Sequence, residues 1–414
     1  MTKIDRLIAE LLLALAVLVP RAAQTQTLTG LDPTFGTGGK VTTNFGTNVR
    51  PSDAALQADG KIVVSTDFYN TQQATIAFGV ASYRSNGAFD GSTYTSFTNF
   101  INSTSALTIQ PDGKIVVVGE AKSADGTLSE FAIARFNVDL SLDSSFGSGG
   151  KVTTNFVGQM LGGVSNPANT VLIQPDQKIL VGGSARLCGN RRCPTYTALA
   201  RYNPDGSLDA SFGNAGKVMV LAIGAATSLA VLTTGDILVL NLSAIAQFSP
   251  NGMPESVTSG TMAVVAHGGL DQFQLSDSKY ILGSGAFDQN DEDQDVKILR
   301  FTPTGGPDTS FNSPLFDYGA EGSPHSDLVQ AVAVAGDRKI AVAGISDSIF
   351  GVARLNSDGS LDRTFGVDGK LTTRFNGSDQ VLAVIVQTDS KIVAVGQTSD
   401  PGSGIVEMAL ARYR

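Results

Sequence analysis

Residues 197–218 read TALARYNPDGSLDASFGNAGKV, and close copies of this stretch recur along the whole chain. Its second half returns as GLDPTFGTGGKVTTNF at 30–45, LSLDSSFGSGGKVTTNF at 140–156 and GSLDRTFGVDGKLTTRF at 359–375. Its first half returns as FAIARFN at 131–137, VKILRFT at 296–302, FGVARLN at 350–356 and MALARYR at 408–414. Degenerate copies of that half lie at 78–84 and 243–249. Self-similarity of this kind is typical of repeat architectures, so these copies decide the fold.

A second motif, IQPDGKIVVVG at 109–119, also recurs in every unit. Its copies are anchored at Lys61, Lys114, Lys178, Lys279, Lys339 and Lys391, with Asp236 at the same position in a weaker copy. The intervals between successive anchors run from 43 to 64 residues. The chain therefore contains seven units.

Each unit contains four short segments of β character. The runs that follow the anchors are rich in β-branched residues, and the ALARYN-like runs alternate large and small side chains. Asp-Gly and its substitutes separate two apolar runs, which is a strong hairpin signal. Asn-Pro-Asp-Gly at 203–206 marks a further turn. Four antiparallel strands per unit, at a period near 50 residues, are typical of a β-propeller.

The two ends of the repeat region predict how the ring closes. The chain opens on the fourth-strand motif at 29–45 and ends on the third-strand motif at 408–414. Seven complete sets of four strands exist only if the N-terminal strand joins the last unit, which removes an unpaired junction. We predict an all-β, seven-bladed β-propeller with four-stranded blades, in which residues 27–414 form one domain. Six or eight blades, or a division into two domains, are the alternatives.

The N-terminus resembles an export signal. Lys3 and Arg6 precede an apolar run at 7–20, and small residues follow. We interpret 1–26 as a signal peptide and short leader, with an uncleaved anchor or an N-terminal helix as alternatives. The protein is then expected in the periplasm, on the cell surface or in the medium. Cys188 and Cys193, in LCGNRRCP at 187–194, could form a disulfide in such a compartment, and two free thiols are the second interpretation.

The composition excludes several classes of function. Charged residues are only 16% of the chain and the net charge is −9, which argues against nucleic-acid binding because that requires cations at phosphates. Two histidines leave little material for His-rich metal sites. No apolar run beyond the N-terminus could span a membrane, and we expect a monomer.

A repeated pair of opposite charges is the most regular polar feature. An Arg in the third-strand motif is followed eight residues later by an Asp, and the last Arg is matched by an Asp at the N-terminus. The pairs are Arg135–Asp143, Arg201–Asp209, Arg300–Asp308, Arg354–Asp362 and Arg412–Asp32. Ser82 and Gln247 replace the Arg in units one and four, before Asp90 and Glu255. We interpret the pairs as bidentate bridges that set the register of strands three and four, with Phe35, Phe146, Phe212, Phe311 and Phe365 packing between blades.

Three irregular segments are candidates for function. The acidic run DQNDEDQD at 288–295 holds Asp288, Asp291, Asp293 and Asp295, which could surround Ca²⁺, although it lacks the Gly and Glu of an EF-hand loop. A solvated acidic loop is the simpler interpretation. Arg191 and Arg192 form a basic patch in the cysteine loop. His267 and His325 precede first strands of neighbouring units and could share one face.

The combined motifs LDxSFGxGGKVTT, QPDGKIVVxG and ALARYNPDGSLDxSFG resemble the delta-60 repeat of secreted bacterial proteins, over about residues 29–414. That resemblance implies a β-propeller and export, but no shared activity and no catalytic residues. Signatures such as G-x-S-x-G and H-E-x-x-H are absent. We therefore expect an exported binding or scaffold module for an extracellular protein or glycan, without a cofactor. The alternative is a hydrolase or lyase at the channel mouth, which could depend on Ca²⁺.

Overall fold

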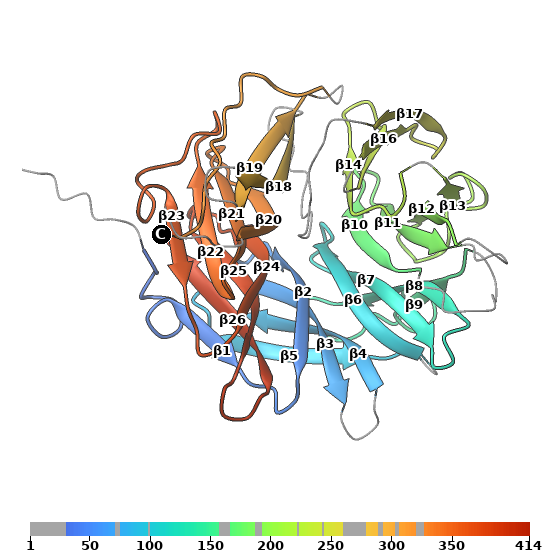
Figure 1. The fold of residues 1–414 in the computed structure, drawn as a ribbon. Helices are drawn as coiled ribbons and strands as arrows, with labels where there is room; N and C mark the ends of the chain where they lie inside the picture. Colours follow the sequence, from blue (N-terminus) through green and yellow to red (C-terminus); the bar gives the residue numbers. More distant parts are fainter. Residues whose placement is uncertain are drawn as a thin grey trace, which may run out of the picture.

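The computed structural model describes residues 30–70, 75–97, 100–156, 166–186, 193–221, 223–241, 244–259, 279–288, 293–302, 306–319 and 327–414. All regular elements in these residues are β-strands, and they form seven separate sheets. Figure 1 shows that the sheets follow one another in chain order around a ring. We call each sheet a blade and number the blades along the chain. The described part is thus all-β, with the repeated sheets of a β-propeller.

The strands divide among the blades as follows. Blade one contains β2 (Val49–Leu56), β3 (Ile62–Asn70), β4 (Thr75–Tyr83) and β5 (Phe89–Thr95). Blade two contains β6 (Phe100–Ile109), β7 (Ile115–Ser123), β8 (Ser129–Phe136) and β9 (Lys151–Thr154). Blade three contains β10 (Ala168–Ile173), β11 (Ile179–Arg186), β12 (Thr195–Tyr202) and β13 (Lys217–Val220). Blade four contains β14 (Ser228–Val231), β15 (Ile237–Leu240), β16 (Ala244–Phe248) and β17 (Pro254–Ser259).

The remaining blades include the one in which the two ends of the repeat region meet. Blade five contains β18 (Tyr280–Asp288) and β19 (Asp293–Phe301), and much of the sequence expected to supply its first strand lies outside the described residues. Blade six contains β20 (Asp327–Val334), β21 (Ile340–Ser346), β22 (Ile349–Leu355) and β23 (Lys370–Thr373). Blade seven contains β24 (Asp379–Val386), β25 (Ile392–Ser399), β26 (Val406–Tyr413) and, from the N-terminus, β1 (Lys40–Thr43).

The N-terminal strand therefore completes the last blade, as the sequence predicts. β1 pairs antiparallel with β26, with Lys40 opposite Ala411 and Thr43 opposite Met408. Upstream of β1, the Asp32 amide donates to the Arg412 carbonyl at 2.8 Å. Hydrogen bonding thus joins the two ends of the repeat region within one sheet.

The turn after each first strand explains the Asp-Gly motif. The Gly113 amide donates to the Gln110 carbonyl at 2.8 Å, and Gly113 has a φ of +84°. This left-handed backbone favours glycine because a Cβ atom is disfavoured there. Blades three, six and seven place Gln177, Arg338 and Ser390 at the same turn position, also with positive φ. The turn geometry is therefore kept even where the glycine is lost.

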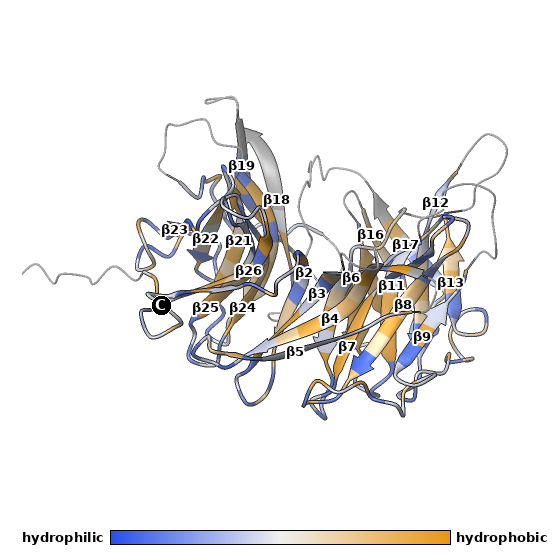
Figure 2. Ribbon diagram, turned by 90° about the horizontal axis from the view of Figure 1, so that it is seen from below, coloured by the Kyte–Doolittle hydropathy of each residue, from blue (hydrophilic) through white to orange (hydrophobic). Residues whose placement is uncertain are grey.

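The core lies between neighbouring blades. The second and third strands are the most buried, and Figure 2 shows hydrophobic stretches along strands such as β11 and β21. One apolar cluster joins blade seven to blade one through Val395, Leu410, Val64 and Tyr83. A smaller cluster joins blades four and five, with Leu238 and Leu240 against Leu282 and Phe301. Apolar burial between blades is the main stabilising contribution in this arrangement.

Buried tyrosines add hydrogen bonds between blades. A third-strand Tyr hydroxyl donates to a Thr hydroxyl on the fourth strand of the preceding blade. The pairs are Tyr83–Thr43 (2.9 Å), Tyr202–Thr154 (2.6 Å) and Tyr413–Thr373 (2.8 Å). Burial raises the pKa of Tyr202 well above its usual value, opposed by its bond to Thr154, so this hydroxyl remains a donor at physiological pH. Within the described residues, no helix could cross a membrane.

We expect a chain that begins at residue 46 to lose cooperative folding, because it lacks β1 and leaves the β26 edge unpaired. A chain that begins at residue 27 is the matched control and should melt in one transition. Thermal unfolding followed by circular dichroism compares the two. Equal melting temperatures would show that β1 does not stabilise the last blade.

Candidate functional site

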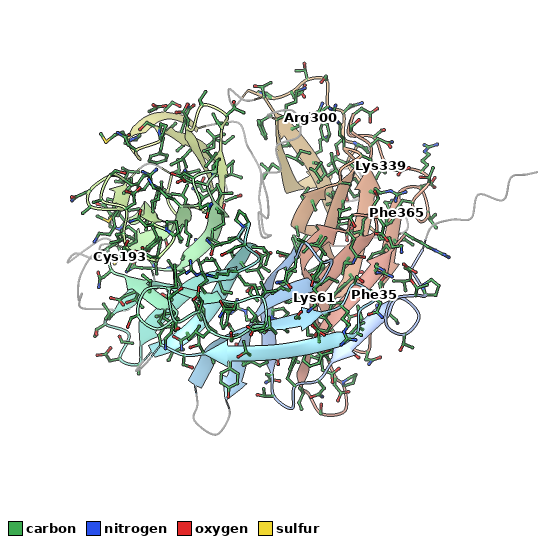
Figure 3. The ribbon with its side chains drawn as sticks, turned by 180° about the vertical axis from the view of Figure 1, so that it is seen from behind. Phe35, Lys61, Cys193, Arg300, Lys339 and Phe365 are labelled. Carbon is green, nitrogen blue, oxygen red and sulfur yellow. The ribbon has the colours of Figure 1, made fainter. Side chains whose placement is uncertain are left out.

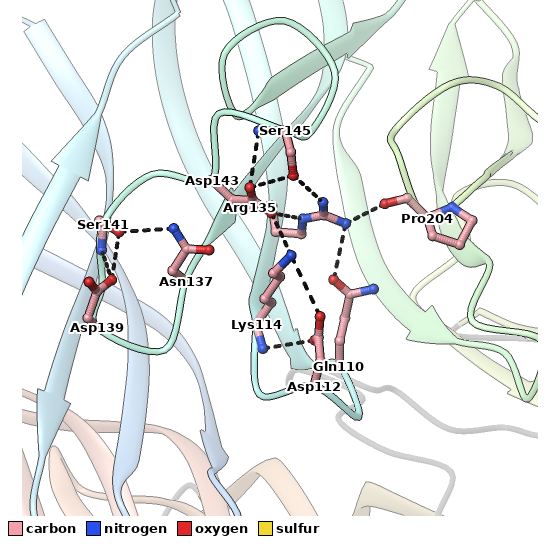
Figure 4. A network of polar contacts seen from close by, with 10 residues as sticks. All are labelled: Gln110, Asp112, Lys114, Arg135, Asn137, Asp139, Ser141, Asp143, Ser145 and Pro204. Carbon is pink, nitrogen blue, oxygen red and sulfur yellow. Dashed lines mark hydrogen bonds and ion pairs between the residues drawn. The ribbon is translucent and has the colours of Figure 1, made fainter.

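The predicted Arg–Asp pairs belong to a larger polar cluster, which we call the clamp. In blade two, Arg135 Nε donates to Asp143 Oδ2 at 2.8 Å, and both side chains are buried. Arg135 Nη1 donates to the Pro204 carbonyl in the turn of blade three. Lys114 Nζ lies 3.1 Å from the same Asp143 oxygen. Figure 4 shows this arrangement, with the guanidinium between its own blade and the next.

The pairing geometry differs from the expected bidentate bridge. In four blades only Nε of the Arg donates to the carboxylate, at 2.7 to 2.8 Å. In blade seven the contact is Arg412 Nη2 to Asp32 Oδ2, at 3.0 Å. Another guanidinium nitrogen reaches a turn carbonyl of the next blade, as in Arg201 to Pro250 and Arg300 to Ser357, both at 2.5 Å. The Arg therefore links adjacent blades as well as adjacent strands.

The Lys anchors are members of the clamp that were not predicted from the sequence. In six blades the anchor's Nζ lies within 3.2 Å of the paired Asp. The pairs are Lys61–Asp90, Lys114–Asp143, Lys178–Asp209, Lys279–Asp308, Lys339–Asp362 and Lys391–Asp32. Figure 3 shows Arg300, Lys339, Phe365, Phe35 and Lys61 following one another around the ring. The sequence held a signal for this role, because the unit that becomes blade four loses the Lys and the Arg together.

The repeated Phe completes the clamp. The Arg135 guanidinium carbon lies 4.5 Å from the centre of the Phe146 ring, and the other four pairs lie at 4.5 to 4.8 Å. The same ring packs on the turn of the next blade, where a Cβ atom on Gly206 would lie 2.9 Å from Phe146. This close approach requires glycine at the turn, in addition to its φ of +89°. Each clamp therefore combines charge, cation–π and shape contacts.

The clamp keeps its carboxylate ionised. Burial disfavours the charged form of Asp143, but hydrogen bonds from Ser145 and Lys114, with the charge of Arg135, hold its pKa well below its usual range. The contribution of this carboxylate to stability is present above its ordinary pKa and is lost as the pH falls through the lowered value. Acid below about pH 4 should weaken the clamps.

Blade four carries a modified clamp. Gln247 Nε2 donates to Asp236 at 3.1 Å and to Glu255 at 3.2 Å. One neutral amide thus replaces two cations, and Asp236 replaces the Lys anchor. This blade sets two carboxylates against a neutral amide, so its clamp lacks the usual charge compensation.

Blade one lacks the central part of the clamp, and its neighbour compensates. Ser82 stands at the Arg position, and Arg84 donates instead to Asp90 at 2.9 Å from the exposed side. No Phe follows Asp90 at the usual spacing. In the facing turn of blade two, Leu140 replaces the glycine and keeps a φ of +70°. Its side chain packs toward Gly91 of blade one and fills space that the Phe occupies elsewhere.

A largely buried polar cluster lies between blades one and two. We call it the seam cluster, and it consists of Ser52, Asp53, Ser65, Asp67 and Thr104. Ser52 Oγ lies 2.8 Å from Ser65 Oγ and donates to Thr104 Oγ1 at 3.0 Å. Thr104 donates its hydroxyl to Asp67 Oδ1 at 2.8 Å and its amide to the same oxygen at 2.6 Å. The result is a chain of hydroxyls that ends at a buried carboxyl group.

Both acids of the seam cluster lie in a strongly desolvated environment. Burial raises the pKa of Asp53 to about 7, against the amides of Leu107 and Ala54, which donate to it at 2.9 and 2.7 Å. Burial raises the pKa of Asp67 to about 6, opposed by Thr104 and the charge of Arg50. Carboxyl groups with such pKa values can exchange protons near neutral pH, a property common at functional sites. Neither acid was predicted from the sequence.

No other acid occupies the position equivalent to Asp53 in the described blades. Residues at the same register, directly after the bulge of the first strand, are Ala106, Thr170, Ala331 and Ala383. An acid among alanines and a threonine was therefore the available sequence signal. The hydrogen bond of Asp53 to the Leu107 amide joins blade one to blade two at this point.

The other predicted site residues are placed only in part. In the acidic run, Asp288 and Asp293 lie opposite each other at the end of the β18–β19 hairpin, Asp295 is buried, and Asp291 lies outside the described residues. Within the described residues no group of three potential metal ligands occurs, and the Ca²⁺ site stays a prediction. Cys193 is disulfide-bonded, whereas Cys188 lies outside the described residues. Arg191, Arg192, His267 and His325 also lie outside them.

Comparison with known proteins supports the fold. Five segments match the family model described as a domain of unknown function (DUF5122) beta-propeller, at residues 57–92, 110–146, 174–212, 275–311 and 335–365. Each match covers the second and third strand motifs of one unit and extends to the fourth. The matches support a β-propeller family, and the delta-60 name stays a prediction. No curated protein matches the chain.

Solved structures with a similar fold include two enzymes and a protease domain. Virginiamycin B lyase from Staphylococcus aureus, solved with quinupristin, has a TM-score of 0.52 at 12% identity, covering 90% of this chain and 98% of the lyase. The α-L-arabinofuranosidase Arb93A from Fusarium graminearum has a TM-score of 0.49 at 10% identity, over 88% and 93% of the two chains. The β-propeller domain of the Trilobed protease from Pyrococcus furiosus has a TM-score of 0.45 at 11% identity, over 88% and 93%. At these identities the similarity to the lyase shows the fold alone.

The clamp predicts the cost of removing one cation. Arg201→Gln should lower the free energy of unfolding by about 3 kcal/mol, because it removes the shortest ion pair of the buried Asp209 carboxylate and leaves Lys178 as its one cation in the clamp. Gln247→Ala, at the same position of blade four, is the control and should cost less than about 1.5 kcal/mol. Urea unfolding at neutral pH measures both. Equal costs would contradict the role assigned to the Arg.

The raised pKa of Asp53 predicts a pH dependence of stability that is opposite in sign to that of the clamps. Its folded pKa of about 7 lies above its ordinary value, so the folded protein retains a proton that the unfolded chain has released. The free energy of unfolding should therefore fall as the pH rises from 5 to 8. Where the folded protein holds this proton and the unfolded chain does not, the free energy of unfolding falls by about 1.4 kcal/mol per pH unit. Asp53→Ala should flatten this fall, whatever its effect at a single pH.

Asp176→Asn, in an exposed turn, is the matched control for Asp53→Ala and should leave the slope unchanged. Melting temperatures measured across the pH range provide the comparison. An unaltered slope in Asp53→Ala would show that this carboxyl group does not titrate there.

Proposed function

We propose that the protein is an exported, seven-bladed β-propeller that acts as a binding or scaffold module for an extracellular protein or glycan. The observation that carries the proposal is the use of the repeated charges. In the described blades, the repeated Arg, Lys and Asp side chains are engaged with one another in the clamps. They stabilise a rigid ring and are not available for chemistry.

The inner strands favour binding over catalysis. First strands of neighbouring blades contact each other, and their half-buried positions include Ser103, Asn169, Gln330 and Gln380. Hydroxyl and amide groups of this kind recognise neutral ligands through hydrogen bonds. The expectation of export is supported by the basic and apolar N-terminal pattern and by the disulfide at Cys193.

The alternative is a hydrolase or lyase, and the seam cluster is what favours it. The raised pKa of Asp67, about 6, suits a general acid or base near neutral pH. Against this alternative, Asp67 is 1% exposed and is already bonded to Thr104. A substrate would need access to a carboxyl group that the blade interface encloses.

The test uses the chain from residue 27 in two parallel screens, a glycan array and a pull-down from the cell-envelope fraction. The expected result is selective capture of one ligand class, retained in Asp67→Asn because a binding module does not need this carboxyl group. Conversion of a captured ligand that is lost in Asp67→Asn would favour the enzyme. Absence of capture in both screens would contradict the binding role.

A further inference from the structure

The outer strand of a regular blade is protected from pairing with another chain. Four of these strands, β1, β9, β13 and β23, are four residues long and begin with Lys. The turn before each strand, FGxGG or its variants FGNAG and FGVDG, folds back on the strand edge, as where the Thr37 amide donates to the Lys40 carbonyl at 2.9 Å. The same bond occurs from Ser148 to Lys151, from Asn214 to Lys217 and from Val367 to Lys370. Short length and covered edge groups are devices that prevent edge-to-edge association.

Blade one has none of these devices. Its outer strand β5 is seven residues long, FDGSTYT, and contains neither Lys nor Pro. It also lacks the FGxGG turn. In the described part of the chain, no backbone hydrogen bond joins residues 91–95 to any group outside blade one. The outer strand of blade four also lacks the turn, but β17 begins at Pro254, which cannot donate a hydrogen bond.

Exposed aromatic side chains lie along this edge. Tyr94 is 63% exposed and Phe89 is 46% exposed. Both lean on other rings, with 5.8 Å between the centres of Tyr94 and Phe68 and 5.7 Å between those of Phe89 and Phe45. The edge is therefore held in place by packing before any partner binds, which lowers the ordering cost of association.

In place of the monomer expected from the sequence, we propose that β5 pairs antiparallel with β5 of a second copy, so that two rings form a dimer through a continuous sheet. A two-fold axis at Thr93 makes the strand complementary to itself. Thr93 then faces Thr93 of the other copy, Ser92 faces Tyr94, and Gly91 faces Thr95. The two Tyr94 rings lie diagonally across the axis, within reach of each other.

Charge is compatible with this pairing. The paired residues 91–95 carry no charge, and Asp90 lies beyond them, so no like charges face each other. The net charge of −9 on each chain repels the copies at long range, and salt screens that repulsion. The dimer should therefore strengthen with salt. This association goes beyond the proposed binding role and does not depend on it.

Sedimentation velocity of the chain from residue 27, from low to high micromolar concentration, tests the proposal. The wild type should shift from monomer to dimer, more completely at high salt. Tyr94→Lys should remove the dimer with only a small loss of melting temperature, because Tyr94 is 63% exposed and the new lysines repel each other. A monomer at every concentration would overturn the proposal. So would a Tyr94→Lys variant that dimerises like the wild type.

Cysteine crosslinking tests the register. Thr93→Cys should form a disulfide-linked dimer under mild oxidation, because the axis brings the two side chains together. Thr95→Cys is the matched control on the same edge, and its two copies would lie about 13 Å apart. Crosslinking of Thr95→Cys as strong as that of Thr93→Cys would overturn the pairing. The proposal would also be overturned if the protein stayed monomeric and Tyr94→Lys abolished its capture of another protein. The edge would then pair with a strand of that other protein.

Discussion

The salt bridge between Asp and two cations, repeated from blade to blade, is the contact on which the rest of this structure depends. The carboxylate joins a Lys at one turn to an Arg on the third strand, and the Arg reaches a carbonyl of the next blade. The Arg and the Asp are buried only because they compensate each other, since an unpaired charge at this interface would be strongly destabilising. A ring of thin sheets thereby acquires specific spacing between neighbours, which apolar packing alone does not impose.

The exceptions to the clamp show how the interfaces adapt. Blade one loses the Arg and the Phe, and Leu140 from blade two fills the space at a backbone angle that normally favours glycine. The same interface holds Asp53 and Asp67, which bond to blade two through backbone amides in place of a cation. Blade one therefore differs from the others at its inner strand, its turn and its outer edge.

Much of the fold follows from local sequence. The Asp-Gly turns, the β-branched runs and the division of the last blade between the two chain ends were all predictable, because each depends on a few adjacent residues or on the order of motifs. The Arg–Asp spacing of eight residues also placed both members of the pair correctly across one turn. The bidentate geometry was wrong, because the guanidinium divides its donors between its own blade and the next, and the next blade cannot be seen from one motif.

The amino-acid sequence by itself determined the number of units, the four strand motifs in each and the strand that joins the two chain ends. Turn residues and the alternation of apolar side chains specify those features within a short length of chain. Only the tertiary structure decided that Lys is the third member of the clamp, that Asp53 and Asp67 are buried together, and that β5 has an open edge. Each of these depends on which residues the neighbouring strand or blade brings within a few ångströms, and that proximity does not exist until the sheets pack.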